Sequence, residues 1–216
     1  MPRTLGRPVG SAYCRIWAGL GSAIMSHVVL YHHALGVTSG VEAFARELRS
    51  AGHIVTVPDL FDGATYTSLD EGVAHIDSVG VQTLLDTGVS LAADYPSEVV
   101  FGGFSLGALV AHKLAQTRPN ANGALLYHYG DVPMDLFGES WPTAVPVQFH
   151  ISEHDKWREV GVVEGFVAAV EPVALVQLFE YPGSAHLFTD STSVEFDPVA
   201  AAQVIERTLS FLDSLN

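Results

Sequence analysis

The stretch Gly103-Phe104-Ser105-Leu106-Gly107 decides the fold, because it follows an apolar run and precedes a helix-like one. Residues 98–102 read as a short buried strand, and residues 108–116 read as a helix. A serine on so sharp a strand-to-helix turn has a strained backbone and its hydroxyl stands above the sheet. Glycine lies two residues before and two after Ser105, where larger side chains would collide across the turn. The pattern predicts a nucleophile elbow, with a tight structural turn as the alternative.

Strand and helix signals alternate along the rest of the chain from Met25 onward. Strands are predicted at 28–31, 54–57, 99–101, 124–127, 147–151 and 175–179. Helices are predicted at 41–50, from about 68 to 94 with a break near Gly80 or Gly88, at 108–116, 160–170 and 198–215. Buried strands that alternate with helices indicate a mainly parallel sheet with helices on both faces. We therefore expect a single-domain α/β fold over residues 25–216.

Composition restricts the classes of partner. The chain has 216 residues and a formal net charge of −14, which argues against binding to nucleic acid or to anionic membrane surfaces. The single cysteine, Cys14, cannot form an internal disulfide, so we expect a reducing, cytoplasmic location. We expect a small-molecule substrate, no cofactor, and a monomer or small homo-oligomer.

Residues 1–24 differ from the rest of the chain. The apolar part, residues 9–25, is interrupted by Arg15 and lacks a convincing cleavage site for a signal peptide. We interpret residues 1–24 as an N-terminal extension, with Met25 as an alternative start directly before the first strand.

Two polar loops follow predicted strands in the later half of the chain. Active groups in a parallel sheet lie beyond the carboxyl ends of the strands, and Asp155 and His186 occupy such loops. The chain order Ser, Asp, His is the order of an α/β hydrolase. Asp155 competes for the acid with Glu153, Asp131 and Asp190, and it would otherwise be a helix cap before Trp157. His186 would otherwise be a surface-loop histidine.

The chemistry requires each of these residue types. A serine hydroxyl is a weak nucleophile, so an imidazole must accept its proton, and a carboxylate must orient that imidazole. The backbone N–H of Leu106, next to the serine, is the predicted first oxyanion donor. In a hydrolase of this kind the second N–H comes from the segment at residues 34–36, and we assign it to Ala34.

Further side chains are candidates for the substrate pocket. We expect His33, Leu35, His128, Trp157 and Phe188 to line it, with core packing as the alternative for each aromatic residue. A metal site at His32 and His33 is disfavoured, because neighbouring residues of a strand point to opposite faces.

The chain resembles the dienelactone hydrolase family over nearly all of residues 25–216. The resemblance lies in the elbow and in the blocks VLYHHALG at 29–36, VPDLF at 57–61, FHISEHD at 149–155 and YPGSAHLF at 181–188. The separation of 31 residues between Asp155 and His186 (186 − 155) is typical of the acid and base of that family.

Three positions depart from the pattern of that family. Its namesake enzymes carry cysteine where this chain has Ser105, glutamate where it has His33, and a substrate-binding arginine where it has Asp190. The resemblance therefore implies a serine esterase that uses an acyl-enzyme and acts on a neutral ester, lactone or thioester. The alternatives are a catalytically weak binding protein of the same fold, and an acyltransferase or peptidase with the same triad.

Overall fold

A computed structural model describes residues 25–215, so the predictions for residues 1–24 lie outside the described residues. Six strands form one sheet in the order β2-β1-β3-β4-β5-β6, and every neighbouring pair is parallel. The strands are β1 (His27–Tyr31), β2 (Ile54–Thr56), β3 (Val100–Phe104), β4 (Gly123–Tyr127), β5 (Val147–Ser152) and β6 (Val176–Tyr181). Every residue of β3, β4 and β5 is buried, as the apolar runs predict.

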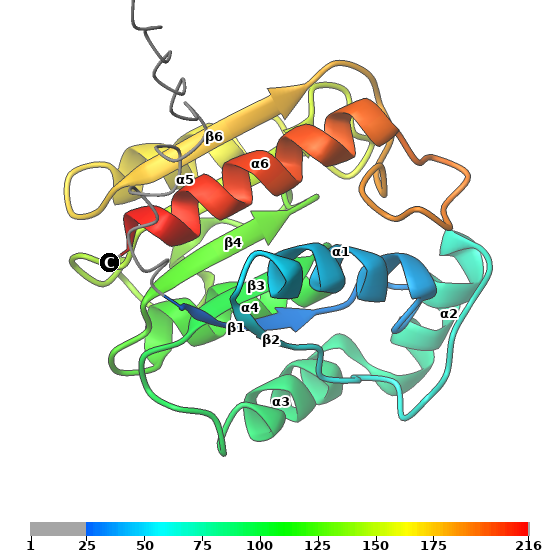
Figure 1. The fold of residues 1–216 in the computed structure, drawn as a ribbon, viewed down its shortest axis with the longest axis horizontal. Coiled ribbons are helices and arrows are strands. Elements are labelled where there is room, and N and C mark those ends of the chain that lie inside the picture. Colours follow the sequence, from blue (N-terminus) through cyan, green and yellow to red (C-terminus); the bar gives the residue numbers. More distant parts are fainter. Residues whose placement is uncertain (1–24, 216) are drawn as a thin grey trace, which may run out of the picture.

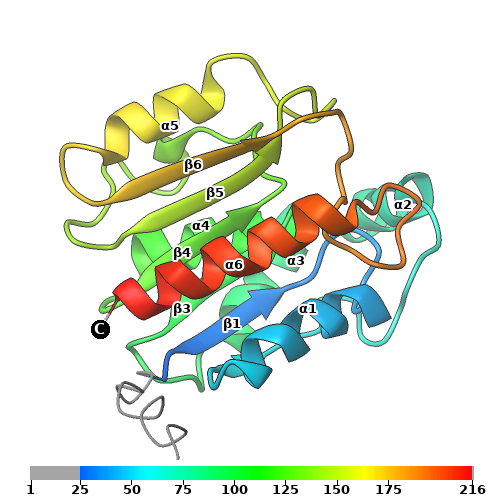
Figure 2. The same cartoon turned by 45° about the horizontal axis from the view of Figure 1, so that its top comes forward.

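Helices cover both faces of the sheet, which confirms the predicted fold class (Figures 1 and 2). The α-helices are α1 (Ser39–Ser50), α2 (Leu69–Val79), α3 (Val81–Leu91), α4 (Leu106–Thr117), α5 (Val162–Val170) and α6 (Pro198–Ser214). On one face, α1 and α6 pack Phe44 and Phe211 into a core with Phe104. On the other, α4 and α5 pack Leu114 and Phe166 into a second core. Burial of these two apolar layers is the main stabilising contribution to the fold.

The long helical stretch breaks at Gly80, one of the two predicted positions. Gly80 has φ 90°, which ends α2 and turns the chain into α3. Gly88 instead lies inside α3. Glycine is needed there because a Cβ would lie 2.5 Å from Val110 Cγ1 of α4. The first glycine is therefore required by the turn and the second by close packing of two helices.

Three helix starts differ from the prediction by two residues, and the first is that of α1, which begins at Ser39 and not at 41. Helix α4 begins at Leu106, directly after Ser105, so the elbow passes into the helix without a linker. Helix α5 begins at Val162, because Gly161 has φ 84° and separates it from the preceding turn. The residues after Asp155 consequently form turns and not a helix that Asp155 could cap.

Several of the buried histidines make the stability of the fold depend on pH. Burial lowers the pKa of His32 and His112 to about 4, that of His150 to about 3, and that of His128 well below its ordinary value. Each therefore stays neutral in the fold while its unfolded counterpart takes up a proton near pH 6.5. Stability is fully present above that pH and is lost as the pH falls toward the folded pKa values.

We expect each of these four histidines to lower the free energy of unfolding by about 1.5 kcal/mol between pH 6.5 and 5, which gives about 6 kcal/mol in all. Urea unfolding at several pH values measures this slope, and His150→Gln should reduce it, because one histidine that takes up a proton only on unfolding is removed. A stability that is flat over this interval would contradict the neutral state of these side chains.

Candidate active site

Ser105 sits on a strained turn at the carboxyl end of β3. Its backbone has φ 50° and ψ −110°, and its N–H donates to the carbonyl oxygen of Tyr127 at 2.9 Å. The turn closes because Gly103 lacks a side chain: a Cβ there would lie 2.1 Å from the carbonyl oxygen of Gly107. A positive φ is unfavourable for serine, so the surrounding contacts hold this conformation.

The loops after β5 and β6 bring two further groups to this serine. His186 Nε2 lies 2.9 Å from Ser105 Oγ, and His186 Nδ1 lies 2.7 Å from Asp155 Oδ2. The other carboxylate oxygen, Asp155 Oδ1, accepts the N–H of Trp157 at 2.9 Å. Because Asp155 accepts only, His186 carries its proton on Nδ1 and presents a lone pair on Nε2 to the serine hydroxyl. This is the tautomer that a general base requires.

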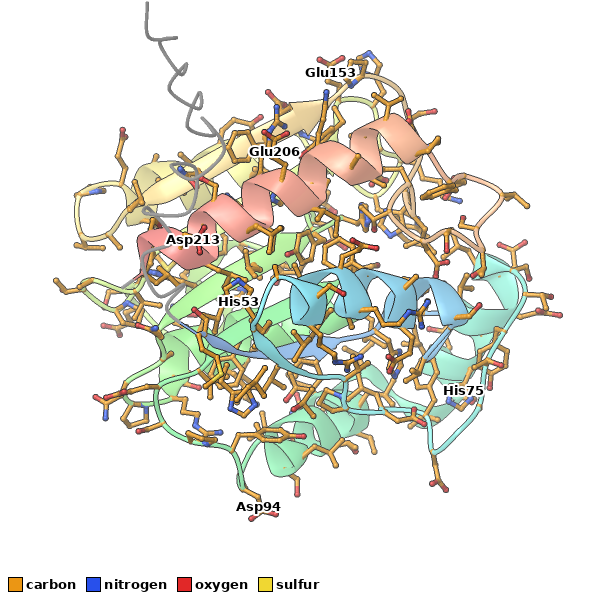
Figure 3. The ribbon with its side chains drawn as sticks, viewed as in Figure 1. His53, His75, Asp94, Glu153, Glu206 and Asp213 are labelled. Atoms are coloured by element: carbon orange, nitrogen blue, oxygen red, sulfur yellow. The ribbon has the colours of Figure 1, made fainter. Side chains whose placement is uncertain are left out.

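The other predicted acids do not contact His186. Glu153 is exposed at the edge of the molecule and its side chain points away from the fold (Figure 3). Asp190 accepts from His33 Nε2 at 2.7 Å, and Asp131 lies on the wall of the cavity. Of the four carboxylates, only Asp155 is hydrogen-bonded to the imidazole of His186, and its side chain is buried.

Two residues with a free backbone N–H line the cavity together with Ser105. Leu106 is the first residue of α4, and the first N–H groups of a helix have no acceptor within it. Ala34 lies in the turn after β1, where the N–H of Leu35 is already donated to His33 Nδ1 at 3.2 Å. Within residues 25–215, neither the Leu106 nor the Ala34 N–H has a hydrogen-bond acceptor. Both residues line the same cavity as Ser105, so both donors are free for a ligand.

The cavity has a volume of about 390 Å³ and a mainly apolar wall. Its lining residues are Ala34, Leu69, Val73, Ile76, Val81, Ser105, Leu106, Leu109, His128, Tyr129, Asp131, Val132, Leu136, Trp157 and His186. None of these side chains is a lysine or an arginine, and Asp131 is the only carboxylate. Such a surface favours uncharged, apolar ligands.

The structure places two of the five predicted pocket residues in this wall. His128 and Trp157 line the cavity, whereas His33, Leu35 and Phe188 do not. His33 turns away because it is bound to Asp190, and Leu35 is buried with an exposed fraction of 6%. Phe188 packs edge-on against the His128 ring, with 4.6 Å between ring centroids, and thus supports a wall residue from behind.

His128 has an unusual environment beside the serine. Its φ is 54°, its Nε2 lies 2.7 Å from Thr189 Oγ1, and its ring centroid is 5.9 Å from that of His186. Burial, followed by the proximity of His186, lowers the pKa of His128 well below the ordinary value. It therefore adds no positive charge to the cavity at neutral pH.

Sequence reasoning missed much of the apolar wall. Leu69, Val73 and Ile76 come from α2, and their spacing of three and four residues marks one face of a helix. The spacing predicts that these three side chains share one face of a helix. The sequence does not indicate that this face lies over the elbow. Val132 and Leu136 belong to the segment after β4, which carries no regular pattern.

His32 and His33 have separate partners and do not converge on a common point. His32 Nε2 accepts the N–H of Leu60 at 2.9 Å, while His33 Nε2 binds Asp190. Across residues 25–215, no three or more histidine, cysteine, aspartate or glutamate side chains are grouped so that they could hold a metal ion. Nor does any helix in this range combine the length and apolar character needed to cross a bilayer.

Solved structures share this architecture, which is that of the α/β hydrolases. A dienelactone hydrolase-like promiscuous phosphotriesterase from metagenomic libraries superposes with a TM-score of 0.72 at 18% identity, covering 90% of this chain and 88% of that one. A putative dienelactone hydrolase from Klebsiella pneumoniae gives 0.66 at 17% identity, covering 89% and 88%. Thermogutta terrifontis esterase 2 phosphorylated by paraoxon gives 0.61 at 15% identity, covering 89% and 83%.

The chain belongs to the dienelactone hydrolase family, whose model matches residues 21–215. The resemblance in the sequence blocks is thereby confirmed, and with it the broad class of hydrolases that act on small molecules. No curated protein sequence matches the chain.

Proposed function

We propose that this protein is a serine hydrolase that cleaves neutral carboxylic esters, lactones or thioesters through an acyl-enzyme. The observation that carries this proposal is the hydrogen-bonded series Ser105–His186–Asp155, with distances of 2.9 and 2.7 Å, at the floor of an apolar cavity. Membership of a hydrolase family supports it. The cytoplasm remains our proposed location, since the sequence has one cysteine.

In the first half-reaction, Ser105 Oγ attacks the substrate carbonyl carbon while its proton passes to His186 Nε2. The carbonyl oxygen becomes an oxyanion, which accepts the free N–H groups of Leu106 and Ala34. Asp155 stabilises the imidazolium through the Nδ1 hydrogen bond. The tetrahedral intermediate then collapses, the bond to the leaving group breaks, and His186 returns the proton to the leaving group.

In the second half-reaction, water attacks the Ser105 acyl ester and gives its proton to His186. Collapse releases the carboxylic acid and returns the proton to Ser105 Oγ. The oxyanion donors act here again, because the same charge develops on the same oxygen. Removal of one such donor typically costs about 100- to 1000-fold in rate.

The cavity wall supports an uncharged substrate. Apolar side chains from α2, α3 and α4 surround the serine, and no cationic side chain is present in the wall to hold a carboxylate. Asp190, which stands at the position of the family's substrate-binding arginine, is turned away and bound to His33. An anionic lactone would therefore lose its hydration without gaining a counter-charge.

A direct test compares p-nitrophenyl butyrate with the p-nitrophenyl monoester of succinic acid. We expect turnover of the butyrate at a kcat/KM at least about 10-fold higher, since burial of an unpaired carboxylate is unfavourable. Acid quenching followed by intact-mass analysis should reveal a butyryl adduct on Ser105. A folded protein that binds the ester but never forms the adduct would favour the binding-protein alternative. Preferential transfer to added alcohols or amines would favour acyl transfer.

Asp131 is expected to contribute to this discrimination. Although Asp131 as a whole is exposed, desolvation at the cavity wall raises the pKa of its carboxyl group, so its negative charge develops at a higher pH than for an ordinary aspartate. Asp131→Asn should raise kcat/KM for the succinyl ester about 2- to 5-fold relative to the butyryl ester, and the gain should grow as the pH rises. The matched control is Asp135→Asn, because Asp135 is an aspartate of the same exposed segment that lies outside the cavity wall. Equal effects of the two variants would contradict a role for Asp131 in the discrimination against anionic substrates.

A further inference from the structure

A buried hydrogen bond joins His33 to Asp190 across 157 positions of sequence. His33 Nε2 lies 2.7 Å from Asp190 Oδ2, and the exposed fractions of the two side chains are 1% and 2%. His33 lies in the turn after β1, whereas Asp190 lies four residues beyond His186 in the loop after β6. Neither residue lines the cavity. The contact therefore joins the turn after β1 to the loop after β6 outside the cavity wall.

The other nitrogen of His33 organises the turn after β1. His33 Nδ1 accepts the N–H of Leu35 at 3.2 Å, which requires that the proton reside on Nε2 and be donated to Asp190. The carbonyl oxygen of His33 accepts the N–H of Gly36 at 3.1 Å. These two bonds fix the turn that contains Ala34, and they leave the Ala34 N–H as its free donor.

The carboxylate of Asp190 accepts hydrogen bonds from three residues. Besides His33, Oδ2 accepts the hydroxyl of Thr38 at 2.5 Å, and Oδ1 accepts the N–H and the hydroxyl of Thr192 at 2.7 and 2.6 Å. Burial alone would raise the pKa of Asp190, but the hydrogen bonds from His33, Thr192 and Thr38 hold it well below its ordinary value. The group is therefore a carboxylate at neutral pH.

The start of α1 packs directly on this carboxylate. A Cβ at Gly40 would lie 1.7 Å from Asp190 Oδ1, so only glycine allows the helix backbone to approach. Thr38, which donates to Asp190, also caps α1 by accepting the N–H of Val41 at 3.1 Å. The turn of Ala34, the first turn of α1 and the loop of His186 consequently meet at one buried group.

We propose that His33 and Asp190 are a positioning pair that fixes the Ala34 N–H relative to His186 and Ser105. This inference rests on the proposed function, because it concerns the oxyanion donor of that reaction. The pair contacts no substrate, and it acts by holding one donor in place before the reaction begins. Its loss should lower kcat and leave KM nearly unchanged, since the oxyanion forms only in the transition state.

Two substitutions of His33 separate positioning from simple packing. His33→Gln keeps a donor near the position of Nε2 that can reach Asp190. His33→Asn is too short to reach Asp190 but keeps an acceptor near Nδ1 for Leu35. We expect His33→Asn to lower kcat about 10- to 100-fold with KM within about 2-fold of wild type. His33→Gln should restore kcat to within about 3-fold of wild type.

His150→Asn is the matched control. His150 is also fully buried and also uses both ring nitrogens, bound to Tyr181 Oη and Gln148 Oε1 at 2.7 Å each, but it lies outside the cavity wall. We expect this variant to lower the melting temperature while kcat stays within about 2-fold of wild type. If His33→Asn does not fold, Thr192→Val removes one donor to Asp190 at an exposed position and should lower kcat about 3-fold.

The experiment measures kcat, KM and melting temperature for wild type and all variants with p-nitrophenyl butyrate. A selective loss of kcat in His33→Asn with rescue in His33→Gln supports the pair. Equal kcat in both variants, or an effect on KM or melting temperature alone, would overturn it. A wild-type protein that neither turns over the ester nor forms an adduct would overturn the proposed function itself, and the role of the pair with it.

Discussion

Replacement of Ser105 by alanine is expected to lower kcat/KM by at least about 10⁴-fold while the protein remains folded. In the proposed mechanism the variant loses the atom that attacks the substrate, whereas His186, Asp155 and the two N–H donors stay in place. Alanine matches the size of serine and the side chain of Ser105 makes a single hydrogen bond, to His186. Residual catalysis above the uncatalysed rate should persist, because the oxyanion donors remain.

The measurement is steady-state hydrolysis of p-nitrophenyl butyrate, with circular dichroism and the melting temperature as checks of folding. Ser78→Ala is a suitable control, because Ser78 is an exposed serine of α2 that donates to the carbonyl oxygen of His75. A Ser105→Ala variant that keeps a tenth or more of the wild-type rate would exclude Ser105 as the nucleophile.

Replacement of Gly107 by alanine should strongly destabilise the protein, with a loss of about 3 kcal/mol in the free energy of unfolding. A Cβ at this position would lie 2.3 Å from the carbonyl oxygen of Tyr31 and 2.6 Å from that of His32. Both are backbone atoms at the end of β1 and cannot rotate away. Helix α4 would have to shift, which would move the N–H of Leu106 away from Ala34 and lower kcat as well.

Gly165→Ala is the matched control for this prediction. Gly165 lies inside α5, and a Cβ there would meet no atom within 4 Å. Alanine should therefore stabilise the helix by about 0.5–1 kcal/mol, because glycine loses more backbone entropy on folding. Urea unfolding of both variants measures the difference, and equal stabilities would contradict the close approach of α4 to β1.

The sequence predicted the layout of the fold because its strands are apolar runs that alternate with helical patterns along the chain. All six strands and the parallel sheet follow from those runs. Helix ends were harder to place. Whether Gly80 or Gly88 ends a helix depends on tertiary packing, since Gly88 is required by a side chain of α4 that lies 22 positions away.

The geometry of the candidate site was partly predictable for a similar reason. Chain order and strand ends are enough to bring Ser105, Asp155 and His186 to one edge of the sheet. Chain order and strand ends predict which residues lie near one another, but not the direction in which each side chain points. His33 follows a strand end as predicted. It does not line the cavity, however, because it is hydrogen-bonded to Asp190, which lies 157 positions away in the sequence.

Labelling with a fluorophosphonate probe, read by intact mass, tests the central claim most directly. We predict one adduct on the wild-type protein, located at Ser105 by peptide mapping, and none on His186→Ala, since the serine then has no base. A folded wild-type protein that stays unlabelled, or an adduct on another residue, would contradict an activated serine at the elbow.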